Sequence, residues 1–164
     1  MGSSVVVFEE TKERRLGPRQ PGQSRYEWVR TSDRASCVRG RATINAWASR
    51  VPEPAVQALS RRLRSHVDTE FLGALFELYV YSLFKAAGFD VTCDSTTPQG
   101  SKPDFCIGDA RSGSFYVEAT TDHGISALNQ PDEAASRMLD RLAPYIKIVG
   151  HVLNVHDFAI GCQE

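Results

Sequence analysis

The chain has 164 residues, enough for one domain or for one domain with an appendage. Hydrophobic residues make up 41% of the chain and charged residues 24%, which argues against wholesale disorder, and no apolar run approaches the roughly 18 residues of a membrane-spanning helix. The first residues lack the basic start and the long apolar stretch of a secretion signal, so we expect a cytoplasmic protein with no membrane partner.

The net charge of −1 conceals two halves of opposite sign. Residues 1–66 hold thirteen of the nineteen basic residues and six of the twenty acidic ones, a balance of +7, whereas residues 67–164 have a balance of −8. Such polarity indicates a basic module that meets a polyanion. The alternative, a basic half that docks on the acidic half, stays open.

Residues 1–65 predict a basic, mainly helical N-terminal extension. The stretch 9–25 is polar and contains two glycines and two prolines, so we interpret it as a flexible linker. Apolar residues within 26–50 are numerous enough for one or two short helices, and apolar residues at helical spacing predict another helix over 55–64.

Three arginines of the helix expected over 55–64 lie off its apolar stripe. We consider them candidates for contact with nucleic acid, with a solvated helix face as the alternative. They are Arg61, Arg62 and Arg64.

Residues 66–164 predict a second domain in which a helix, three strands, a helix and a strand follow one another. The first helix is expected over 69–87, with a cap at Asp68 or Thr69 and an end at Gly88, and its apolar residues cover most of its circumference, as in a buried helix. The other expected elements are strands over 89–94, 103–107 and 115–120, a hairpin turn over 108–114, a helix over 132–142 and a strand over 151–158.

One glutamate, Glu77, lies inside this apolar helix. Glutamate is almost never fully buried without a partner, because desolvation of an unpaired carboxylate costs several kcal/mol. An arginine of the basic N-terminal region would provide such a partner, and a metal ion would provide another.

Two further carboxylates fall on neighbouring strands. Strand alternation places Glu118 on one face with Tyr116 and Thr120, and Asp104 on one face with Cys106. If the hairpin pairs Asp104 with Glu118, two like charges lie side by side, which is unfavourable unless a cation lies between them. Mg²⁺ suits such a site because it takes oxygen ligands, usually one or two carboxylates completed by waters and phosphates.

These residues resemble the motifs of the PD-(D/E)xK superfamily of restriction-endonuclease-like nucleases: Pro103-Asp104, then Glu118-Ala119-Thr120, with Glu77 on the preceding helix. The expected order of elements is also similar to that superfamily's αβββαβ core. The phrases LFELY at 75–79 and AGFDV at 87–91 resemble a mostly uncharacterised bacterial branch. The resemblance covers residues 66–158 and implies an α/β fold with a mixed central sheet flanked by helices.

The resemblance also implies a role for each residue. Asp104 and Glu118 would bind Mg²⁺ or Mn²⁺, Glu77 would be a helical ligand, and the backbone carbonyl of Ala119 would lie beside the metal. The metal would polarise the scissile phosphate and lower the pKa of the attacking water. The implied activity is hydrolysis of nucleic acid, DNA before RNA, in bacterial defence or repair.

Thr120 departs from the family pattern because it stands at the position of the motif lysine. Threonine can hydrogen-bond a water but supplies no positive charge, and loss of one stabilising donor typically costs about 10²–10³ in rate. Lys102, or Arg137 on the following helix, could replace the charge, and His123 could carry a proton.

Two functions therefore stay open. The first is a metal-dependent nuclease, favoured by the retention of all three acids. The second is a degenerate member that keeps the fold and binds nucleic acid or a protein partner without cleaving, favoured by the missing lysine. A homodimer, or a C-terminal region missing after residue 164, stays open as the source of an absent cation or recognition element.

Overall fold

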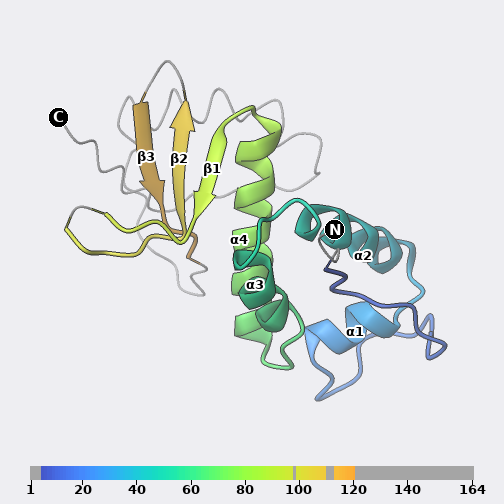
Figure 1. Ribbon diagram of the computed structural model, residues 1–164. Coiled ribbons are helices and arrows are strands. Elements are labelled where there is room, and N and C mark those ends of the chain that lie inside the picture. The colour runs from blue at the N-terminus through green and yellow to red at the C-terminus, as the bar shows by residue number, and fades with distance from the viewer. Residues whose placement is uncertain (1–4, 98, 110–112, 121–164) are drawn as a thin grey trace, which may run out of the picture. The chain divides into compact units, whose positions relative to one another are not determined.

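The computed structural model describes residues 5–97, 99–109 and 113–120, and this part of the chain is a mixed α/β structure with four helices and one sheet of three strands (Figure 1). It divides into two compact units, residues 1–79 and 80–164, which we consider one at a time. The helices are α1 (Arg25–Thr31), α2 (Ala35–Ala48), α3 (Ala55–Leu63) and α4 (Asp68–Ala86), and the strands are β1 (Asp90–Cys93), β2 (Phe105–Asp109) and β3 (Gly113–Val117). None of the helices in the described part is long and apolar enough to cross a membrane.

The helices of the first unit match the sequence prediction. α1 and α2 lie within the predicted stretch 26–50, except that α1 begins one residue earlier, at Arg25. α3 lies within the predicted range 55–64. The stripe of α3 is buried as its spacing predicts, at Val56, Leu59 and Leu63.

An N-terminal segment that the sequence did not single out is part of this core. Val7 and Phe8 are buried, and the Phe8 ring stacks on Tyr26 with centroids 5.4 Å apart. Asn45 of α2 fixes the backbone here: its Oδ1 accepts hydrogen bonds from the N–H groups of Val7 and Phe8, each at 3.0 Å, and its Nδ2 donates to the Phe8 carbonyl at 2.9 Å. One amide side chain thus satisfies three backbone groups of an extended segment.

The stretch 9–25, which we interpreted as a flexible linker, makes long-range polar contacts within the first unit. Arg15 forms an isolated bridge with Ser32, and the Arg19 guanidinium lies 2.8 Å from Oδ2 of Asp68, at the start of α4. The Arg25 N–H donates to the other oxygen of Asp68 at 2.7 Å and, with Arg19, holds the pKa of that carboxyl below its usual value. Long-range polar contacts of this kind leave no periodic signal in a sequence.

Helix α4 ends as the sequence predicts. Gly88 has φ +85°, its N–H donates to the Lys85 carbonyl at 3.1 Å, and the N–H of Phe89 donates to the Phe84 carbonyl at 3.0 Å. This pair of bonds is the Schellman motif, which requires a left-handed residue that glycine adopts without strain. The rings of Phe84 and Phe89 meet at 5.5 Å and add the hydrophobic contact typical of the motif.

In the second unit, β1, β2 and β3 form an antiparallel sheet in sequence order. Phe105, Ile107 and Val117 are buried on one face of it, where Phe105 lies 6.1 Å from the ring of Tyr81 and Phe115 lies 5.9 Å from that of Phe84. Residues 80–86 of α4 therefore cover this face. The helix predicted over 132–142, the strand over 151–158, Arg137 and His123 lie outside the described residues.

We expect Ile107→Ala to lower the free energy of unfolding by about 2–5 kcal/mol, because Ile107 is 0% exposed and the truncation leaves a cavity under the sheet. Urea unfolding followed by circular dichroism measures it, with exposed Thr92→Ala on β1 as the matched control. Equal effects of the two substitutions would show that this face of the sheet is not the core of the second unit.

Candidate metal centre

Asp104 and Glu118 flank the base of the β2–β3 hairpin. The observed register ends with Phe105 opposite Val117, and Asp104 and Glu118 lie one residue beyond the strands, which were expected to include them. If the register continued by one position, Asp104 would lie opposite Glu118, on the face opposite to that of Phe105 and Val117.

The side chain of Asp104 is fixed by the chain that leaves β3. Its Oδ2 accepts a hydrogen bond from the N–H of Ala119 at 2.7 Å. This bond joins the two strand ends one residue past Glu118 and is charge-assisted, so it is stronger than a neutral backbone bond. The sequence indicated a role for the carbonyl of Ala119 but gave no signal for its N–H, because the bond joins residues fifteen positions apart.

The two carboxylates differ in exposure. Asp104 is partly buried, whereas Glu118 and Thr120 are exposed, and neither carboxylate forms an ion pair with any basic residue in the part of the chain that the structure describes. Each ionised carboxylate offers about four lone-pair sites, of which Asp104 uses one on Ala119. Adjacent oxygen donors of this kind fit Mg²⁺ or Mn²⁺, with waters or phosphate oxygens completing the shell.

Glu77 has a different environment, in the first unit. Its side chain is 13% exposed, and Nη1 of Arg62 lies 2.6 Å from Oε1 and 2.8 Å from Oε2. Gly73 lies one turn earlier on α4, and a Cβ there would be 3.4 Å from Nη2 of Arg62, an ordinary van der Waals contact. The arginine partner that the sequence left open is thus present, and the role of Glu77 as a metal ligand stays a prediction.

The described residues do not form a metal site with three protein ligands. No group of three or more His, Cys, Asp or Glu side chains that could hold a metal occurs among the described residues. The pair Asp104 and Glu118 is therefore the candidate centre, and one or two carboxylates are the usual protein contribution to a Mg²⁺ site.

Neither residue proposed to replace the charge of the motif lysine lies in a described strand: Lys102 precedes β2, and Arg137 lies outside the described residues. β2 begins at Phe105, so the strand alternation that would put Lys102 on the face of Asp104 does not extend to Lys102, which is exposed. Thr120 follows β3 and offers a hydroxyl group only.

The three arginines predicted to contact nucleic acid separate in the structure. Arg62 pairs with Glu77, and Arg64 donates to the carbonyls of Val6 and Val7 and lies 3.7 Å from Glu9. Arg61 is exposed. Arg62 and Arg64 therefore make stabilising contacts within the first unit.

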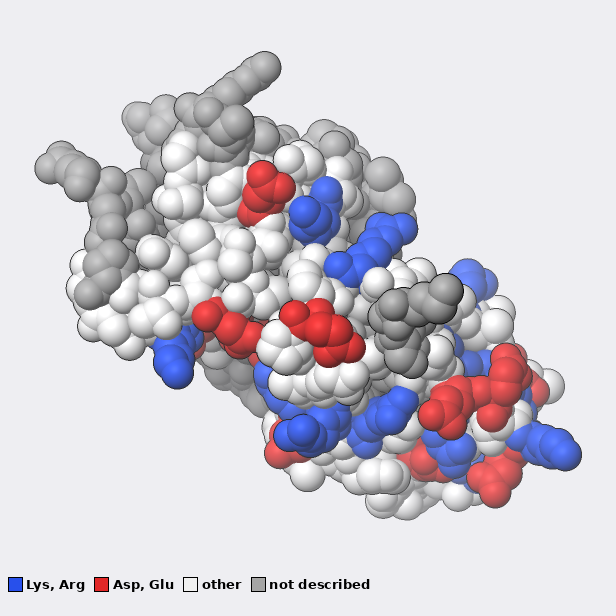
Figure 2. All heavy atoms as spheres, in the orientation of Figure 1, with Lys and Arg blue, Asp and Glu red and all other residues white. Residues whose placement is uncertain are grey.

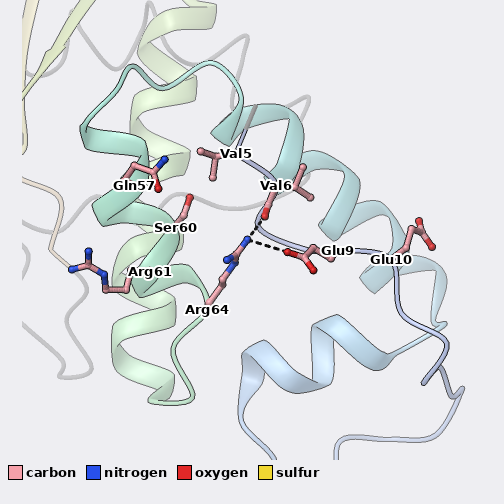
Figure 3. Close-up of a pocket in the computed structure, with 8 residues that line it drawn as sticks. All are labelled: Val5, Val6, Glu9, Glu10, Gln57, Ser60, Arg61 and Arg64. Atoms are coloured by element: carbon pink, nitrogen blue, oxygen red, sulfur yellow. Dashed lines mark hydrogen bonds and ion pairs between the residues drawn. The ribbon is translucent and has the colours of Figure 1, made fainter. Parts of the chain in front are cut away.

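A hollow of about 770 Å³ lies beside α3, away from these carboxylates in the sequence (Figure 3). Figure 3 shows Arg64 directed toward Val6 and Glu9 across this hollow, while Arg61 points away from them. The lining residues are Val5, Val6, Glu9, Glu10, Gln57, Ser60, Arg61 and Arg64.

Charge pairing within the first unit accounts for part of its excess of basic residues. Besides Arg62 and Arg64, four more arginines have acidic partners: Arg14, Arg19, Arg25 and Arg30. On the face drawn in Figure 2, basic and acidic side chains lie next to one another in several places. The excess therefore does not form one continuous basic surface on that face.

Comparisons of the chain with models of protein families, with curated proteins and with solved structures found no match.

We expect a coupling energy of about 1 kcal/mol between Arg62 and Glu77, because the carboxylate is mostly buried while the arginine is 44% exposed and screened by solvent. A double-mutant cycle measures it from urea unfolding of Arg62→Met, Glu77→Gln and the double variant. Strictly additive effects would mean that the pair contributes nothing to the fold, and Glu77 would then need another partner.

Proposed function

We propose that the chain is a Mg²⁺- or Mn²⁺-dependent nuclease that hydrolyses phosphodiester bonds of nucleic acid, DNA before RNA. The observation that carries the proposal is the β2–β3 register, which ends at Phe105 and Val117; one further position would set Asp104 opposite Glu118. Neither carboxylate has a basic partner among the described residues. Such a pair is unfavourable by itself and becomes favourable with a divalent ion.

The order of the elements supports the same proposal. A long helix followed by three antiparallel strands is the first part of the restriction-endonuclease-like core that the motifs imply. The complete αβββαβ core, with a mixed sheet and a second helix, is part of the proposal, as is a setting in bacterial defence or repair.

Each residue would act through a simple property. Oxygens of Asp104 and Glu118 would hold the ion, and the N–H of Ala119 keeps the Asp104 carboxylate from rotating away. The ion, when bound, polarises the phosphate and makes water a better nucleophile at neutral pH. The Thr120 hydroxyl could orient that water, but it adds no charge, so we expect a rate about 10²–10³ below that of an enzyme with the motif lysine.

The second candidate is a catalytically degenerate module that binds nucleic acid or a protein partner. Thr120 favours it, since no cation from the described strands takes the place of the motif lysine. In this case the carboxylate pair would bind metal without turnover.

We expect plasmid DNA to be cleaved with Mg²⁺ or Mn²⁺, and Asp104→Asn to lower the rate by about 10²-fold or more, because metal assistance is worth several kcal/mol. Asparagine keeps an acceptor for the Ala119 N–H, so this variant removes the charge and leaves the hydrogen bond. Gel assays on plasmid, single-stranded DNA and RNA measure the rates.

The matched control is Asp90→Ala, which removes an exposed carboxylate from β1 of the same sheet. Cleavage that survives in Asp104→Asn would remove the site assignment. If no substrate is cleaved while Asp104-dependent metal binding is still seen by calorimetry, the degenerate module is correct.

A further inference from the structure

The hollow beside α3 lies within the first unit, and its two walls differ in chemistry (Figure 3). One wall is a polar side of α3 and of the residue that follows it, with Gln57, Ser60, Arg61 and Arg64 at helical spacing. The other wall is the N-terminal segment, with two valines and two glutamates. Its volume of about 770 Å³ is within the range of about 300–1,000 Å³ that is usual for small-molecule sites.

Arg64 brings a guanidinium group to this hollow. Its Nε donates to the Val7 carbonyl at 3.2 Å and its Nη2 donates to the Val6 carbonyl, so the side chain is held in one orientation. Its Nη1 has no hydrogen-bond partner among the described residues. The N–H groups of Nη1 are therefore available to an anionic group of a ligand.

Ser60, one turn before Arg64, adds a hydroxyl group without a partner. Ser60 is 5% exposed, and its Oγ is buried and forms no hydrogen bond in the part of the chain that the structure describes. Figure 3 shows its side chain rising from α3 toward Val5, on the other wall. A buried hydroxyl without a partner is unfavourable, and a ligand that forms a hydrogen bond with it removes this cost.

Glu9 provides the opposite charge. Its Oε1 lies 3.7 Å from Nη2 of Arg64, which is a long ion pair, and its side chain is 80% exposed. Gln57 adds a second acceptor, because its Nε2 donates to Glu53 at 3.0 Å while its Oε1 forms no hydrogen bond with a described residue. The hollow thus presents free donors on one side and free acceptors on another.

We propose that the hollow binds a free α-amino acid with an apolar side chain. The charges of Arg64 and Glu9 sum to zero, so a zwitterion complements them better than a simple anion, which Glu9 would repel. The carboxylate of the amino acid binds Arg64 and Ser60, and its ammonium group binds Glu9 and Gln57. An α-amino acid carries both charged groups on one carbon atom, which suits an arginine and a glutamate that lie only 3.7 Å apart.

The remaining lining residues favour an amino acid over a nucleotide. Val6 is 41% exposed and lies beside Val5, so the hollow offers apolar surface that an aliphatic side chain can cover. The described lining residues include no aromatic ring on which a base could stack. Arg61 points away from Val6 and Glu9 in Figure 3, so the two arginines do not converge on one phosphate. The inference goes beyond the proposed function and shares no residue with the candidate metal centre.

The test is isothermal titration calorimetry of the full chain with L-leucine, N-acetyl-L-leucine and L-leucinamide. The acetyl derivative lacks the ammonium charge, and the amide lacks the carboxylate charge. Leucine should bind, and each derivative should bind about tenfold more weakly or worse, because each loses charge-assisted hydrogen bonds. Equal binding of the three compounds, or no binding of leucine, valine or phenylalanine, would overturn the proposal. Tighter binding of adenosine monophosphate than of leucine would also overturn it.

Two variants and a matched control locate the site. Ser60→Ala should weaken leucine binding about tenfold without lowering the free energy of unfolding, because the hydroxyl that it removes has no partner among the described residues. Glu9→Gln should weaken binding to a similar extent. The control is Glu10→Gln on the same segment, which should leave binding unchanged, because Glu10 is 98% exposed and pairs with Arg14 at 3.1 Å. Unchanged affinity in both Ser60→Ala and Glu9→Gln, or equal effects of the two glutamate substitutions, would contradict the proposal.

Discussion

The register of the β2–β3 hairpin is the constraint on which the candidate site depends. It is set by the buried face of the sheet, where Phe105 and Ile107 of β2 lie opposite Val117 and Phe115 of β3. A slip by one residue would move every side chain to the other face and expose this core. The same hydrophobic pairing fixes the two strand ends that Asp104 and Glu118 directly adjoin.

The acidic residues discussed above differ in their partners. Glu77 is mostly buried, and Nη1 of Arg62 lies within 3 Å of its carboxylate. Asp104 receives one backbone N–H, and no described basic residue pairs with it or with Glu118. If the register continues one position beyond the strands, the two carboxylates would lie side by side, and the divalent ion that we propose would offset their repulsion. The paired arginines, by contrast, hold the first unit together.

The elements that the sequence predicted are those with local signals. The apolar circumference of α4 and the stripe of α3 follow from periodicity, and the end of α4 follows from its glycine. The strands follow from their apolar runs, but they exclude Asp104 and Glu118, whose role stays a prediction. Two sets of hydrogen bonds are indicated by no sequence pattern, because they join residues far apart in the sequence. In one, Asn45 accepts from the N–H groups of Val7 and Phe8; in the other, Asp104 accepts from the N–H of Ala119. Composition indicated the basic character of the N-terminal half but not which arginines have acidic partners. Two of the three arginines predicted to contact nucleic acid, Arg62 and Arg64, have such partners.

The most direct test of the account is to locate a bound ion. A crystal of the protein grown with Mn²⁺ should show an anomalous scattering peak between the side chains of Asp104 and Glu118, about 2.1 Å from an oxygen of each. That peak should be absent from Asp104→Asn, while the hydrogen bond to Ala119 remains. A peak bound by neither residue, or no peak at saturating Mn²⁺, would contradict the claim that the hairpin register builds a metal centre.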